Sequence, residues 1–405
     1  MRQRGGARAV LLRSAYVTAI ASNLGFAFGV LGPSIRHDLG LGRGALGLLS
    51  SLFFACTGIA SIAAGRLVAR WGTRVPATCA LALTCLGCLT AAVTGRYVGL
   101  IVAAVVAGSG YSVVNVVTNR MVRSVAAPAE LGWLMAVKTA GVPIATTLAA
   151  MVGAATSRWG WRPALGVLAV VAAPASLLAA RTFTLRRPVA TASAPQARLG
   201  PGFWLLPVAG FCAIAGSQPL YSWFATYLHD SLGVRTGTAT LISGIVTATG
   251  IPSMLGAARL SDRLGPARRA EFLAGLCLVV AAALTVVFGA HAVGLASAIV
   301  AVAFGAAANL SFAGLFPALI VECAPGALER GTGVAMTGYF LGALASPVGF
   351  GLLSDTAGGY RLAWATACAV TVVGAMTFVV LGRRLRWSGG RPSAADPVPD
   401  VPLAG

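Results

Sequence analysis

The chain has 405 residues, of which 10% are charged and 57% are hydrophobic, and its mean hydropathy is +0.84. This composition excludes a soluble domain of ordinary surface polarity and predicts that lipid surrounds most of the chain. A net charge of +20 would suggest nucleic acid in a soluble protein, but here the arginines fall between long apolar runs, so we expect a membrane protein with no nucleic-acid partner.

Twelve apolar runs of about 20 residues follow one another along the chain. As a helix, such a run crosses roughly 30 Å of hydrocarbon at about 1.5 Å per residue. The first run follows a basic stretch but is long enough to span, so we read it as a transmembrane helix and not as a cleaved signal. The predicted spans lie near 14–35, 44–64, 75–94, 97–118, 133–155, 163–181, 204–227, 238–258, 270–289, 292–318, 331–353 and 362–382.

Arginine is distributed unequally between the two sides that these spans would separate. With the N-terminus inside, 22 arginines lie in inside segments and seven in outside segments. The positive-inside rule then predicts a multi-pass protein of the cytoplasmic (inner) membrane with both termini in the cytoplasm. The lipid bilayer is therefore an expected partner, and we expect a monomer.

A segment rich in Arg, Pro, Ala and Ser separates the sixth run from the seventh and is typical of a linker. The chain is thus divided into four predicted parts. These are an N-terminal six-helix bundle (1–181), a cytoplasmic linker (182–203), a C-terminal six-helix bundle (204–382) and a disordered cytoplasmic tail (383–405).

The two halves repeat each other. The segment 65–74 aligns with 258–268 at an offset of 193, and Trp161 aligns with Tyr360 at an offset of 199. The fold class predicted is an all-α membrane protein of twelve transmembrane helices in two pseudo-symmetric six-helix bundles. In transporters built from parallel six-span repeats, the solute site lies at the interface of the repeats near the bilayer midplane.

The loop between the second and third runs carries a motif that resembles GxLxDRxGRR of the major facilitator superfamily (MFS) of secondary transporters. The matching residues are Gly65, Leu67, Arg70, Gly72 and Arg74. Ala69 replaces the acid of the motif. The loop between the eighth and ninth runs keeps that acid as Asp262, beside Arg263 and Gly265, and replaces the opening glycine by Ala258.

The resemblance covers essentially the whole chain and implies two bundles that rock around a central site. It also implies a cytoplasmic gate made by the two loops. The predicted gate residues are Gly65, Arg70, Gly72, Arg74, Asp262, Arg263 and Gly265. Because Ala69 stands in the first loop, only the second loop can present a carboxylate, that of Asp262, to a neighbouring helix N-terminus.

Two further stretches are similar to family members. WGWRPAL at 159–165 resembles a Gly-Trp-Arg sequence that opens the sixth span in many of them. KTAGVP at 138–143 resembles the Lys-Gln-x-Gly-Val-Pro of a branch that includes cyanate and nitrate-type permeases, with Thr139 in place of glutamine. The second match is too short to name a substrate.

Lys138 is the only lysine of the chain and lies within the apolar fifth run. Three hypotheses are open for it. Its stem could carry the ammonium to the membrane surface, it could form a gate ion pair with Asp262, or it could attract an anionic solute in a central cavity.

Polar residues recur at helical spacing on runs that line the cavity in the family. Tyr111 and Asn115 are four apart on the fourth run, and Gln218 and Tyr221 are three apart on the seventh. Asn23 lies seven residues after a tyrosine on the first run. We predict substrate binding by these five residues and Lys138, with hydrogen bonding between helices as the alternative role.

Signatures of enzymes are weak, and we expect no catalytic residue, no cofactor and no metal site. A GxGxxG at 42–47 has no preceding strand, and His37, His229 and His291 are far apart. We therefore expect a secondary transporter of a small organic or anionic solute. The alternatives are antiport-driven efflux of a hydrophobic drug or natural product and, less favoured, a membrane-embedded receptor or enzyme. No acid lies near the middle of a run, which argues against proton coupling, and coupling to a proton or counter-ion is left open.

Overall fold

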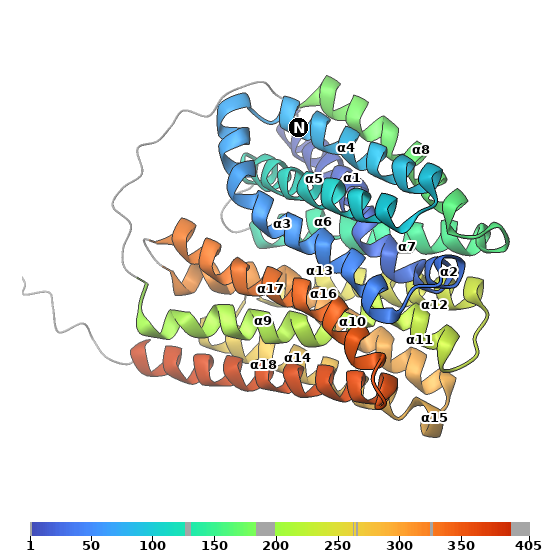
Figure 1. Ribbon diagram of the computed structural model, residues 1–405. Helices are drawn as coiled ribbons and strands as arrows, with labels where there is room; N and C mark the ends of the chain where they lie inside the picture. The colour runs from blue at the N-terminus through green and yellow to red at the C-terminus, as the bar shows by residue number, and fades with distance from the viewer. Residues whose placement is uncertain are drawn as a thin grey trace, which may run out of the picture.

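The computed structural model describes residues 2–125, 131–183, 199–261, 263–264, 266–324 and 327–389. These residues form helices and no strand. Twelve helical stretches among them are long and apolar enough to cross a membrane, which confirms the predicted number of spans. The helices pack as two bundles, one above the other in Figure 1.

The first half holds the first six spans. Its elements are α1 (Arg2–Val30), α2 (Gly32–Leu39), α3 (Arg43–Trp71), α4 (Arg74–Thr94), α5 (Tyr97–Arg123), α6 (Leu131–Thr139), α7 (Gly141–Ala155), η2 (Ser157–Trp159) and α8 (Trp161–Thr182).

The second half repeats this plan with more interruptions. Its elements are η3 (Pro201–Trp204), α9 (Leu205–Ser217), α10 (Pro219–Ser222), α11 (Phe224–Asp230), α12 (Thr236–Ala248), α13 (Gly250–Ser261), α14 (Pro266–Phe288), α15 (Ala290–Val293), α16 (Leu295–Cys323), α17 (Leu328–Ser354) and α18 (Gly359–Gly389). The last helix continues into the first residues of the predicted tail. The rest of that tail, and most of the predicted linker, lie outside the described residues.

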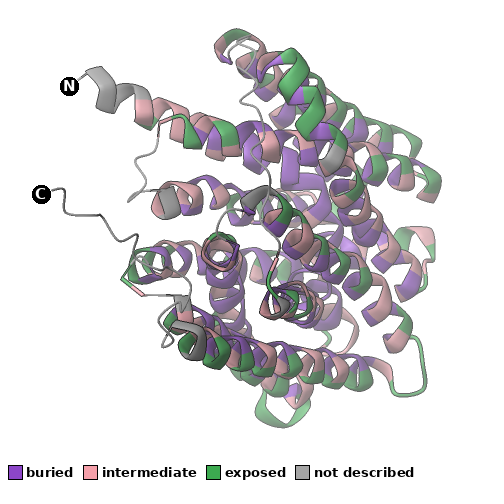
Figure 2. Ribbon diagram, turned by 90° about the vertical axis from the view of Figure 1, so that its left-hand side faces the viewer, coloured by how far each residue is buried: buried purple, intermediate pink, exposed green. Residues whose placement is uncertain are grey.

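We call the end of the molecule at which α8 ends and α9 begins the linker end, and the end that holds α2 and α15 the opposite end. Helix α1 begins and α18 ends at the linker end, which faces the viewer in Figure 2. In that view, buried segments of the ribbon lie where the helices face one another, and exposed segments cover much of the outer surface.

Prolines explain why the fifth and eighth spans are each broken into two helices. Proline has no N–H, so it cannot donate to the carbonyl four residues earlier. Helix α6 ends at Thr139, four residues before Pro143, and α12 ends at Ala248, four residues before Pro252. Pro347, in contrast, lies within α17 and does not end it.

The two halves pack against each other through α3 with α17, α7 with α12, and α1 with α10 and α11. Glycine permits the close approach, because a Cβ at Gly29 would clash with the Tyr221 carbonyl oxygen and one at Gly47 with that of Pro347. The Thr240 hydroxyl also donates to the Val30 carbonyl oxygen at 2.9 Å. The interface is therefore held by backbone contacts as well as by side chains.

Candidate functional site

Lys138 lies in the last turn of α6, where the helix dipole favours a cation. Its side chain is only 4% exposed. The ammonium donates to Asn115 Oδ1 at 2.7 Å and to Asn119 Oδ1 at 3.1 Å, both on α5. Lys138 thus hydrogen-bonds to a neighbouring helix and is enclosed by the protein.

We call the cluster of Lys138, Asn115 and Asn119 the ammonium site. The groups that it can offer to a further partner are all hydrogen-bond donors. An ammonium has no acceptor, so each asparagine must turn its Oδ1 toward it and its amide NH₂ away. Among the described residues no carboxylate pairs with Lys138. Asp262, the partner in the gate hypothesis, lies outside the described residues.

A series of ring contacts begins one turn from the ammonium site and crosses to the second half. We call it the aromatic chain, and its members in order are Tyr111, Phe53, Phe54, Phe26 and Tyr221. Successive ring centroids lie 5.6, 5.4, 5.8 and 6.5 Å apart. Since Tyr111 and Asn115 are four residues apart on α5, the polar and aromatic groups adjoin.

Helix α17 adds two half-buried rings from the second half. Tyr339 stacks on Phe316 at 6.2 Å and meets Phe340 edge to face at 5.5 Å. Phe340 faces the first half, because a Cβ at Gly58 would lie 3.3 Å from the Phe340 Cβ. Rings from both halves therefore lie at the interface between them.

The remaining predicted substrate residues are buried but less directly connected. Asn23 is 3% exposed, and its Oδ1 has no hydrogen-bond partner among the described residues. Gln218 is buried at the break between α9 and α10, and the hydroxyl of Tyr221 donates to the Ala306 carbonyl oxygen at 2.9 Å. No hydrogen bond within the described part of the chain joins Asn23 or Gln218 to Lys138.

The predicted cytoplasmic gate is only partly described. Gly72 ends α3 with φ +75°, a conformation that favours glycine, and its N–H donates to the Val68 carbonyl oxygen at 3.0 Å. Gly65, Arg70 and Arg263 are exposed, and Arg74 begins α4. Asp262 and Gly265 lie outside the described residues, so the gate stays a prediction.

Sequence reasoning missed the residue that holds the second loop. Arg269 is buried, and its Nε donates to Ser261 Oγ at 2.7 Å. Its Nη2 donates to the carbonyl oxygens of Ser261 and Leu264 at 2.8 and 3.2 Å, and it also pairs with Glu322. The matching position in the first half, at the offset of 193, is Pro76, so the repeat gave no signal for this arginine.

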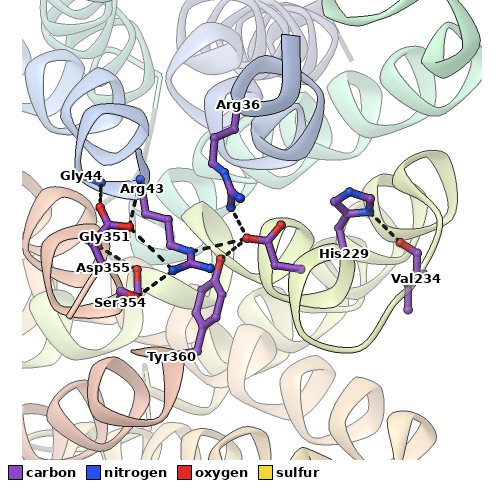
Figure 3. A network of polar contacts seen from close by, with 10 residues as sticks. Arg36, Arg43, Gly44, His229, Val234, Gly351, Ser354, Asp355 and Tyr360 are labelled. Atoms are coloured by element: carbon purple, nitrogen blue, oxygen red, sulfur yellow. Dashed lines mark hydrogen bonds and ion pairs between the residues drawn. The ribbon is translucent and has the colours of Figure 1, made fainter. Parts of the chain in front are cut away.

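Asp230 at the end of α11 is the centre of a charged cluster at the opposite end (Figure 3). Arg36 pairs with its carboxylate, and Arg43 Nε lies 3.5 Å from its Oδ2. The hydroxyl of Tyr360 donates to the same oxygen at 2.9 Å. Because the arginines belong to the first half and the aspartate and tyrosine to the second, the cluster ties the halves together.

Asp355 adds a helix cap to this cluster. Helix α3 begins after Gly42, which has no side chain to cap it. The Asp355 carboxylate of the second half accepts instead from the backbone N–H of Gly44 at 3.0 Å and of Arg43 at 3.3 Å. Its charge also suits the positive end of the helix dipole. We call Arg36, Arg43, Asp230, Asp355 and Tyr360 the opposite-end network.

The first half has a simpler version of the same contact. Trp161, in the stretch that resembles the family's Gly-Trp-Arg, donates from Nε1 to Asp38 Oδ2 at 2.8 Å. Arg162 donates to the carbonyl oxygens of Ala92 and Val93 at the end of α4, both at 2.9 Å. These residues join elements within one half.

Two repeated six-helix bundles, one of which holds a buried cation, with a charged cluster that joins them, have the architecture of a membrane transport protein. The sequence profile of the Major Facilitator Superfamily matches residues 15–319, and the chain belongs to this family. The resemblance noted from the motifs is thereby confirmed at the level of the superfamily.

Solved structures share the fold at low sequence identity. One is a bacterial homologue of the human lysosomal transporter Spinster, inward-facing and unoccupied, with TM-score 0.75, 16% identity, and 96% of this chain and 99% of that chain covered. A D-xylose-proton symporter gives TM-score 0.76, 16% identity and coverages of 91% and 96%. No curated protein sequence matches the chain. None of these results singles out the cyanate and nitrate-type branch.

Proposed function

We propose that the protein is a secondary carrier that moves a small organic or anionic solute by alternating access. The ammonium site is the observation that carries this proposal. A cation buried within the membrane is costly unless it is compensated, and two neutral amide oxygens compensate it less than an anion would. A bound anion would complete the site, with contacts from Asn115 and Asn119.

The contacts between the halves suggest which state of the cycle is represented. At the linker end of α1, Leu12 and Tyr16 are 69% and 37% exposed, whereas Asn23, seven residues after Tyr16, is buried. The opposite-end network joins the halves beyond that point. We propose that this state is closed at the opposite end, and that the loops with Gly72 and Arg263 close the linker end in the alternate state.

If the linker end faces the cytoplasm, as the arginine distribution predicts, the state is inward-facing. Opening the opposite end then requires separation of Arg36 and Arg43 from Asp230, and release of the cap on α3.

Flux into proteoliposomes tests the proposal directly. Purified protein would be reconstituted and screened with radiolabelled organic acids, inorganic anions and neutral solutes. We expect flux of at least one anion and a strong loss in Lys138→Gln. Leu278→Ala, on the exposed surface of α14, is the control and should transport normally. Absence of flux for every solute would count against a carrier.

Efflux of a hydrophobic compound is the second candidate. The aromatic chain favours it, because rings at the interface of the halves suit an apolar solute. The buried position of the Lys138 ammonium, bound to Asn115, favours a charged solute instead. Export of an uncharged compound that is unaffected by Lys138→Gln would support this second candidate over the first.

A further inference from the structure

We infer that the solute is an organic monoacid with an apolar body about the size of a ring. Its carboxylate would bind at the ammonium site, and its body would lie along the aromatic chain. This inference rests on the proposed carrier function and narrows its substrate class.

The charges around the ammonium site indicate that the solute carries a single negative group. Lys138 supplies one positive charge, and the amide NH₂ groups of Asn115 and Asn119 add neutral donors. A zwitterion would also need a carboxylate for its own cation. The described acids that form ion pairs already hold arginines, as Asp230 and Asp355 do at the opposite end and Glu271 and Glu322 do at the linker end.

The spacing of the two groups indicates a short apolar body. Tyr111 is one helical turn, about 6 Å, from Asn115. Its ring stacks on Phe53 at 5.6 Å, and the contacts continue through Phe54 to Phe26. A carboxylate at the asparagines can therefore carry a ring, a few bonds away, that reaches the aromatic chain.

Partial burial makes the two asparagines and one ring of the aromatic chain available to a solute. Asn115, Asn119 and Phe26 are half-buried, and so is Tyr339 on the other side of the interface, whereas the other four rings of the aromatic chain are buried. Lys138, in contrast, is nearly inaccessible and is presented by the two asparagines. A monoacid would thus meet amide groups and ring edges first and the buried cation behind them.

Equilibrium binding to the purified full-length protein, measured by calorimetry, tests this with four probes. They are 4-phenylbutyrate, its neutral amide 4-phenylbutyramide, the ringless acid butyrate, and the cation 4-phenylbutylamine. We expect the first to bind at least about tenfold more tightly than each of the others, because each comparison removes a charged contact or a buried ring.

Variants assign the two preferences to the two parts of the site. Lys138→Gln should abolish the preference for the acid over its amide, and Lys138→Arg, which keeps the charge, should retain it. Phe26→Leu should weaken the preference for 4-phenylbutyrate over butyrate. Leu278→Ala, on the exposed surface of α14, should change neither. Lys138→Arg keeps the test valid if Lys138→Gln does not fold.

Several results would overturn the inference. They are equal binding of the acid and its amide, a preference for the acid that survives in Lys138→Gln, or equal binding of butyrate and 4-phenylbutyrate. Flux of another solute by protein that does not bind 4-phenylbutyrate would also overturn it while leaving the carrier function intact. The expected binding without any flux would support the inference and count against the carrier function.

Discussion

The two halves carry the same contact at the opposite end, but only one of them uses it to reach its partner. In each half, an aromatic residue at the start of the last span donates to an aspartate that follows the first span. Asp38 accepts from Trp161 within the first half. Asp230 accepts from Tyr360 and also binds Arg36 and Arg43 of the other half. Both repeats thus contain the local hydrogen bond to an aspartate. In the second half, Arg36 and Arg43 also bind this aspartate and so link it to the first half.

The fifth and eleventh spans differ in the same way. Lys138 is buried and bound by two asparagines of another helix. Its match at the offset of 199, Thr337, is exposed and donates to the Gly333 carbonyl oxygen of its own helix at 2.8 Å. Of these two matched positions, only Lys138 carries a charge. We expect function to depend most on the residues that break the repeat.

The largest effect is expected when Lys138 is replaced by threonine, the residue at the matching position 337 of the second half. Lys138→Thr removes a charge-assisted contact, so flux of an anionic solute below saturation should fall by about 10- to 150-fold, or about 1.5–3 kcal/mol. Thermal stability should hold or rise, because a buried charge is removed. Thr337→Val, the matched change, should leave flux within about twofold. Similar losses in both variants would refute the asymmetry.

The loops at the linker end allow a comparison of backbone stability. Gly72 has φ +75° and ψ −163°, a region nearly restricted to glycine. Gly72→Ala should therefore lower the free energy of unfolding by about 2 kcal/mol, measured as a lower melting temperature. Gly65→Ala lies inside α3 with open space around the new methyl group and should be neutral or slightly stabilising. Equal melting temperatures would show that this turn is not strained.

Asp230→Asn and Asp38→Asn compare the two aspartates. The arginine side chains at Asp230 are 27% and 26% exposed, so solvent screens these ion pairs and they stabilise less than a buried ion pair would. We therefore expect Asp230→Asn to shift the equilibrium between the closed and the open opposite end by about 1–2 kcal/mol toward the open state. Hydrogen–deuterium exchange should then become faster over 32–46 and 224–235. Asp38→Asn should leave exchange over 224–235 unchanged, and faster exchange there in both variants would contradict the distinction.

The smallest effects are expected from the two aromatic donors. Tyr360→Phe removes one hydrogen bond, worth about 1 kcal/mol, whereas Trp161→Phe removes one hydrogen bond and also part of a fully buried indole ring. Tyr360→Phe should favour opening of the opposite end, because its acceptor, Asp230, also forms ion pairs with arginines of the first half. The loss of Trp161 should lower the melting temperature without changing exchange over 224–235. Equal hydrogen–deuterium exchange over 224–235 in the two variants would show that Arg36 and Arg43 do not make the two contacts different.

The number of spans and the fold class could be predicted, because both depend on local composition. Run length and the repeated motifs indicated twelve helices in two bundles, which the structure and the family match confirm. Pro143 and Pro252 lie just after the breaks of the fifth and eighth spans, but Pro347 does not break α17. Proline removes a hydrogen bond in each case, and the surrounding packing decides whether the helix continues.

The site could be predicted in part. Lys138 stood out as a cation in an apolar run, and Asn115 as a polar residue on the fourth span. Their hydrogen bond depends on the packing of α5 against α6, which no spacing along the chain reveals. The opposite-end network was missed for the same reason. Arg36 and Asp230 are 194 residues apart, and only the interface between the halves brings them together.

The cap that Asp355 places on α3 connects a helix end of one half to an acid of the other. Its partners, and the arginines beside it, lie where dissolved ions can approach, since Asp355 is 39% exposed. Mobile ions screen charges beyond about 8 Å at physiological ionic strength. The balance between the two orientations proposed for the protein should therefore shift with the salt concentration on that side of the membrane. The medium, and not only the solute, would then set how often the opposite end opens.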